Sequence, residues 1–111
     1  MPRLIIADPA VEEFRSALAD LAVLSEAAAI KLHSRVLHRL DDLARHPEFG
    51  RLRPEYSRWL PDVRSSAVDA LVMFSHRPCP DTVEVVRIID GRQDLPALLG
   101  LAPQDEDQDG N

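Results

Sequence analysis

The chain has 111 residues, enough for one domain with a modest core, and its hydrophobic share of 45% is ordinary for a globular protein. Its single cysteine, Cys79, excludes an internal disulfide, and no stretch has the roughly 20 apolar residues of a membrane-spanning helix or the pattern of a secretion signal. The formal net charge is −6, but residues 103–111 hold four acidic and no basic residues, so the rest is closer to neutral. We therefore expect a soluble cytoplasmic protein with no membrane partner.

Arginine supplies almost all of the positive charge. Of the 13 basic residues only Lys31 is a lysine, and seven arginines lie between residues 35 and 64. Arginine favours bidentate pairing with carboxylates and phosphates, so an acidic partner or a nucleic acid is one interpretation. Because five acidic residues share this segment, we favour the other interpretation, ordinary solvated side chains.

A short strand and a first helix open the chain. Residues 3–7 (RLIIA) are typical of a strand. Asp8 is then expected to act as the N-cap of a helix over about 9–23, with Pro9 at the first helical position. An apolar stripe at helical spacing supports this helix: Val11, Phe14, Leu18 and Leu21.

A second helix is predicted from 26 to 45. Ser25 caps it, and Pro47 ends it. The expected buried face is Ala29, Leu32, Val36, Leu40 and Leu43, widened by Ile30, Leu37 and Ala44. Since the joint between the two helices is short, they should form an antiparallel hairpin.

Three strands are predicted in the second half, at 62–68, 70–77 and 82–90. Four residues that interrupt regular structure make 47–61 an irregular connection: Pro47, Gly50, Pro54 and Pro61. The segment 77–81 (RPCPD) should end the middle strand, because proline has no N–H for a ladder. The order β-α-α-β-β-β predicts an α+β domain over 1–102, a helical hairpin on a mainly antiparallel sheet of three or four strands.

The last strand is apolar on both faces. Strict alternation places Val83, Val85 and Ile89 on one face and Val86 and Ile88 on the other. One face meets the helices. The other is either a partner surface or is covered by a loop or by the apolar hook at 98–99. Residues 103–111 are expected to form a disordered acidic tail.

The sequence holds no constellation typical of catalysis or metal binding. His38 and Asp42 share a helix face but have no third ligand, and Ser75 and His76 are strand neighbours whose side chains point to opposite faces. Cys79 lies between two prolines in a turn. We therefore predict no catalytic residue, no cofactor and no metal.

Four segments carry a resemblance to a known family. They are HPEFGR at 46–51, Arg64-Ser65, VMF at 72–74 and the block from Val83 to Leu99. Together they resemble the ParE branch of the ParE/RelE superfamily of type II toxins over about residues 3–99. Two departures are AVDAL at 67–71, where the family usually has Pro-x-Gly and a basic or aromatic pair, and Ser75, where an aromatic residue is common.

The resemblance implies a growth-inhibiting toxin that binds a cognate antitoxin and, when free, poisons DNA gyrase without catalysis. The RelE branch instead cuts messenger RNA, which requires cations at the phosphate and a proton carrier. Ala70 and Leu71 stand where a sheet arginine is expected, and no tyrosine or histidine follows His76. A RelE-type ribonuclease and a degenerate, non-toxic antitoxin-binding module are the alternatives. No sequence-specific nucleic-acid binding is expected.

The candidate partner-binding residues are three arginines of the strand region: Arg64, Arg87 and Arg92. We expect Arg92 to be available to a partner and Asp94 to hold the turn after the last strand.

Overall fold

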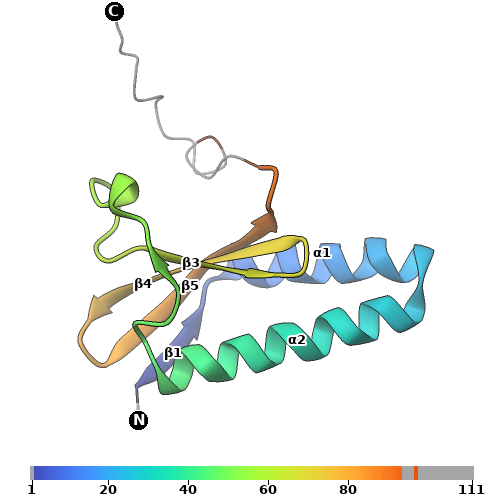
Figure 1. Cartoon of the computed structure of the whole chain (residues 1–111), viewed down its shortest axis with the longest axis horizontal. Helices are drawn as coiled ribbons and strands as arrows, with labels where there is room; N and C mark the ends of the chain where they lie inside the picture. The colour runs from blue at the N-terminus through green and yellow to red at the C-terminus, as the bar shows by residue number, and fades with distance from the viewer. Residues whose placement is uncertain (1, 94–96, 98–111) are drawn as a thin grey trace, which may run out of the picture.

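The structure, a computed structural model, describes residues 2–93 and 97. Strand β1 (Arg3–Ile6) leads into helices α1 (Asp8–Leu24) and α2 (Glu26–Arg45). The short elements β2 (Arg51–Leu52) and η1 (Pro54–Tyr56, a 3-10 turn) follow, and then the long strands: β3 (Arg64–Val68), β4 (Leu71–Cys79) and β5 (Thr82–Asp90). The predicted α+β class and the helical hairpin are confirmed (Figure 1).

The sheet has five strands in the order β1-β5-β4-β3-β2. Strand β1 pairs in parallel with β5, and the other pairings are antiparallel. The expected count of three or four was wrong because β2 contributes only two residues, opposite Arg64 and Ser65, and two residues show no periodicity in a sequence. Gly50 directly precedes this strand with φ of +106°, and a Cβ there would lie 2.9 Å from the Ser65 carbonyl oxygen.

Helix α2 has the predicted bounds. The Ser25 hydroxyl accepts a hydrogen bond from the Ala28 N–H at 3.1 Å, so the expected N-cap is present. Helix α1 begins one residue earlier than expected, at Asp8. Ala7 is its N-cap, since its carbonyl accepts from the Ala10 and Val11 N–H groups, and Asp8 instead places its charge in the first turn.

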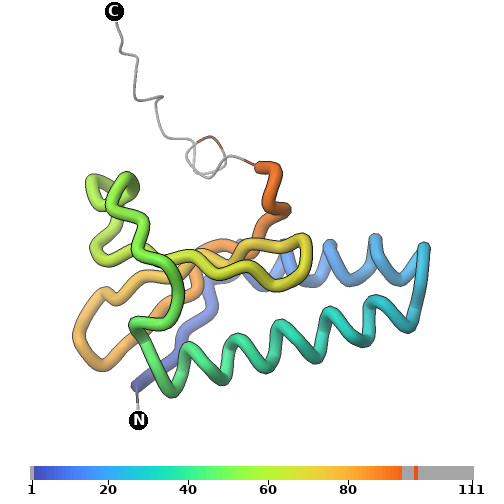
Figure 2. The backbone as a smooth tube through the Cα atoms, in the orientation of Figure 1, coloured from blue at the N-terminus to red at the C-terminus, as the bar shows by residue number. Residues whose placement is uncertain are grey.

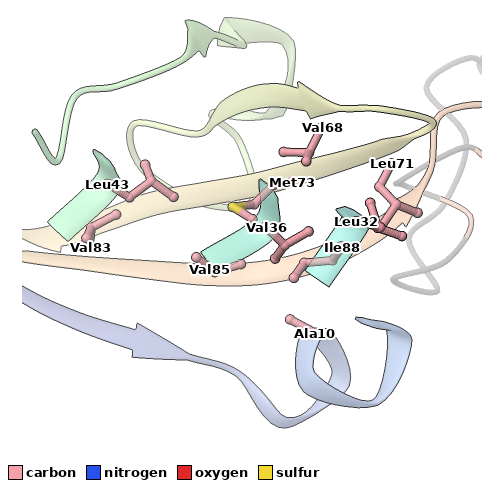
Figure 3. Close-up of a cluster of buried hydrophobic side chains, with 10 residues drawn as sticks. All are labelled: Ala10, Leu32, Val36, Leu43, Val68, Leu71, Met73, Val83, Val85 and Ile88. Carbon is pink, nitrogen blue, oxygen red and sulfur yellow. The ribbon is translucent and has the colours of Figure 1, made fainter. Parts of the chain in front are cut away.

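The main core lies between the helical hairpin and the sheet. Figure 3 shows Val36 and Leu43 of α2 grouped with Met73, Val83 and Val85 of the central strands. The predicted face of α2 is buried at four of its five positions, while Leu40 is half-buried at its edge. Two residues expected to widen it are exposed, Ile30 at 64% and Leu37 at 48%.

A β-bulge overturns the predicted faces of β5. Phe74 pairs with Arg87 and Ser75 with Val85, so Val86 is an extra residue in the ladder. The alternation therefore shifts. Ile88 joins Val83 and Val85 in the core beneath the helices, and Ile89 lies in the cluster on the opposite face.

The opposite face of the sheet is covered in part by the segment that contains η1. Val63, Phe74 and Ile89 form its buried cluster, with Tyr56 packed edge-on against Phe74 at 5.9 Å between ring centroids. The loop interpretation of the second apolar face is thus confirmed for this cluster. The apolar hook at 98–99 and the acidic tail lie outside the described residues.

Strand β4 continues two residues beyond its predicted end. It includes Pro78 and reaches Cys79, which pairs with Thr82. The ladder is irregular between His76 and Cys79, so the missing N–H of Pro78 falls where regular pairing is already interrupted. Strand β3 starts later than predicted, after Asp62 turns the chain with φ of 54°.

Candidate partner-binding site

Arg64 holds the chain around the start of β3. Its Nη1 donates to the Glu48 carbonyl at 2.8 Å, and its Nη2 lies 3.2 Å from the Asp62 carboxylate. The side chain is 22% exposed. These contacts join the segments before β2 and before β3, so the structure gives Arg64 a structural role.

Arg87 joins β5 to α1. Its Nε donates to Glu13 Oε2 at 2.8 Å, and its Nη2 contacts the same oxygen. The other Glu13 oxygen accepts from the Ile88 backbone N–H at 3.0 Å. Both side chains of this ion pair are largely buried. Sequence reasoning missed Glu13, because it lies 74 residues from its partner and no local pattern marks it.

Arg92 lies at the turn after β5, with 91% of its side chain exposed. Its Nε and Nη2 each donate to the Asp90 carboxylate at 2.9 Å, and its backbone N–H does the same. These hydrogen bonds lower the pKa of Asp90 to about 2, the side-chain bond being the larger cause, and raise the pKa of Arg92. Asp90 thus holds this turn. Asp94, which was expected to do so, lies outside the described residues.

The three predicted arginines do not form one cluster. Arg92 lines a groove of about 880 Å³ beside α1 and the end of β5, and Arg87 contacts Glu13 on its wall, but Arg64 is not part of it. The groove has an apolar floor to which four elements contribute: Leu21, Leu32, Leu71 and Ile88. Its charged lining residues are mostly acidic: Glu12, Glu13, Asp20, Asp69 and Asp90.

The groove extends towards the exposed joint of the helical hairpin. Figure 2 shows that the hairpin runs well beyond the sheet, so its joint has no strand beneath it. Val23 and Leu24 are 85% and 84% exposed there, and Ile30 is 64% exposed. Leu24 also lines the groove, so apolar surface continues from the groove to the hairpin joint.

A second, polar cavity of about 500 Å³ lies between α2 and the β3–β4 turn. Arg35 pairs with Asp69 at 2.5 Å, and Arg39 Nη1 donates to the Ala67 carbonyl at 3.0 Å. These two contacts tie the turn to α2, while the buried Arg39 Nε has no hydrogen-bond partner among the described residues and lies 3.7 Å from the Asp42 carboxylate.

His76 and Glu84 form a cross-strand pair, with His76 Nε2 2.9 Å from Glu84 Oε1. His76 is 7% exposed, and its Nδ1 has no hydrogen-bond partner among the described residues. Within residues 2–93 and 97, no group of three His, Cys, Asp or Glu side chains could hold a metal ion, and no helix could cross a membrane.

Comparisons with protein-family models and with solved structures both find similar proteins. The family model described as the ParE toxin of the type II toxin-antitoxin system parDE matches residues 4–95. Among solved structures, a chain of the chromosomal ParDE TA system from P. aeruginosa aligns with a TM-score of 0.64 and 17% identity, covering 81% of this chain and 96% of that one. At this identity the structural match establishes a shared fold. A comparison with curated protein sequences gave no match.

Proposed function

Because this chain belongs to the ParE toxin family of type II toxin-antitoxin systems, we propose that it inhibits growth by binding DNA gyrase and is neutralised by a cognate antitoxin. The family match over residues 4–95 is the observation that carries the proposal. A small domain acts on a larger machine in this way by binding one state of its cycle more tightly than the others. Poisoning of this kind needs a surface and no catalytic group.

The placement of the basic residues supports a non-catalytic mode of action. Arg87 is held by Glu13, and Arg64 by Asp62 and the Glu48 carbonyl. Cations engaged in this way are poorly placed to bind a scissile phosphate. Ala70 in the β3–β4 turn and Leu71 at the start of β4 stand where a RelE-type ribonuclease would be expected to have an arginine.

Two assays on purified, antitoxin-free protein test the proposal. DNA supercoiling by gyrase, with detection of linear DNA, measures poisoning. A translating-ribosome reaction analysed by primer extension measures cleavage of messenger RNA. We expect linear DNA to accumulate and messenger RNA to stay intact. Codon-phased cuts in the messenger RNA, with gyrase unaffected, would favour the ribonuclease alternative instead. Inactivity in both assays would favour the non-toxic antitoxin-binding module.

The variant Arg92→Ala tests, in the same gyrase assay, whether this one side chain contacts the target. The side chain is the exposed cation of the predicted set, so its loss should weaken partner binding by about tenfold if it contacts a carboxylate or phosphate of the target. Arg45→Ala is the matched control, because Arg45 is also exposed and pairs with one nearby carboxylate, Asp41. Equal activity of the two variants would remove Arg92 from the binding surface.

A further inference from the structure

Strand β5 extends beyond the strand that covers its outer edge. The last β1–β5 pair is Ile6 with Val85, and the Ala7 N–H makes one more bond to the Val85 carbonyl before α1 begins. From Val86 to Asp90, β5 has β4 on one side and no strand of the described chain on the other. Such an edge is a template for pairing with another extended chain.

Side chains satisfy the edge N–H groups of this segment. The Ile88 N–H donates to Glu13 Oε1 at 3.0 Å, and the Asp90 N–H donates to Gln93 Oε1 at 3.1 Å. These two residues alternate along β5, as the outward-facing groups of an edge strand do. An incoming strand can take over both bonds, while the Glu13 carboxylate keeps its ion pair with Arg87.

The groove described above lies along this edge and determines which segment would fit. Ile88 and Asp90 belong both to the edge and to the groove lining. Its floor suits apolar side chains, and Glu12 and Asp20 of α1 are exposed carboxylates on its wall. Glu12 forms a solvent-exposed ion pair with Arg15, and breaking such a pair costs little free energy. Arg92 is the basic residue among the described lining residues.

We propose that the β5 edge from Val86 to Asp90 is a strand-addition site for an extended segment of the antitoxin in which basic and apolar residues alternate. This inference rests on the proposed toxin function, because it assigns the partner. Main-chain hydrogen bonds to Ile88 and Asp90 give the segment its register. Apolar side chains pack on the groove floor, and basic side chains meet the carboxylates of α1.

The test starts from a displayed library of random 12-residue peptides selected on the folded, full-length protein. We expect the selected peptides to contain more Lys and Arg than Asp and Glu, and to slow amide hydrogen exchange at Ile88 and Asp90 in NMR spectra. N-methylation at each peptide position in turn should abolish binding at alternate positions, because only every second N–H of an added strand faces β5. A helical ligand would instead be sensitive at consecutive positions.

Charge reversal on the groove wall provides the matched pair of variants. Glu12→Lys should weaken binding of the selected peptides about tenfold, whereas Asp41→Lys should leave it unchanged. Both carboxylates are exposed on helices and pair with one nearby arginine. The proposal would be overturned if the selected peptides were acidic, or if no peptide were selected. It would also be overturned if amide protection were confined to β1 or β2, if N-methylation abolished binding at consecutive positions, or if the protein self-associated in place of binding peptide. The assay contains no gyrase, so its failure is distinguishable from failure of the proposed toxicity.

Discussion

Among the charged side chains, Glu13 is the one whose removal should destabilise the fold most. It holds the Arg87 guanidinium and the Ile88 N–H at once, and both members of the ion pair are largely shielded from solvent. Glu13→Ala should lower the free energy of unfolding by about 2–4 kcal/mol, because a shielded charge loses this partner and a backbone donor loses its acceptor. Chemical denaturation measures the change.

Glu12 is the control for this prediction. It is the next residue on α1, and its pair with Arg15 has side chains 66% and 72% exposed. Glu12→Ala should therefore change the free energy of unfolding by less than about 0.5 kcal/mol. If the two variants unfolded at the same denaturant concentration, the Glu13 contacts would not contribute to stability as described.

Asp90 should make stability depend on pH in a narrow acidic window. Its hydrogen bonds from Arg92 lower the pKa in the folded state from 3.8 to about 2. A group with a lowered folded pKa contributes stability above its unfolded pKa and loses it as the pH falls through the folded pKa. The difference in unfolding midpoint between the native chain and Asp90→Asn should thus shrink between pH 4 and pH 2. A constant difference across that window would contradict this.

At the scale of elements, local signals predicted the helices well and the sheet incompletely. Helix α2 has the predicted bounds because Ser25 and Pro47 act on the backbone next to them. The bulge at Val86 and the short strand β2 arise from pairing between distant segments, which no local pattern encodes. The groove was missed for the same reason, since its walls come from α1 and from β5.

Helix α2 provides a direct test of which apolar positions are core. Leu43 is 1% exposed, whereas Leu40, expected to be equally buried, only packs against the edge of the cluster. Leu43→Ala should cost about 2–5 kcal/mol through lost transfer free energy and a cavity. Leu40→Ala should cost about half of that or less, because solvent and neighbours can fill the space. Thermal denaturation of both variants would show the order, and a reversed order would mean that α2 is rotated relative to this structure.

At the scale of the whole molecule, the folded unit should not need the acidic end of the chain. The family match stops at residue 95, and the two hydrophobic clusters use residues from Leu4 to Ile89. Residues 103–111 carry four carboxylates and no apolar anchor that could be buried profitably. A chain ending at Ala102 should therefore melt within about 2 °C of the full chain, since a loss of even 1 kcal/mol would shift the melting temperature by about 4–8 °C in a domain of this size.

The same truncation separates folding from partner binding. Removing four negative charges should strengthen association with acidic targets and weaken it with basic ones, and more so at low salt. Peptides selected on the full chain should then bind the truncated chain slightly less well at low ionic strength and equally well at 0.5 M salt, because the tail acts on the basic peptides only through its long-range field. A large loss of binding that persists at high salt would mean that the tail contacts the ligand directly, and the strand-addition site would have to include it.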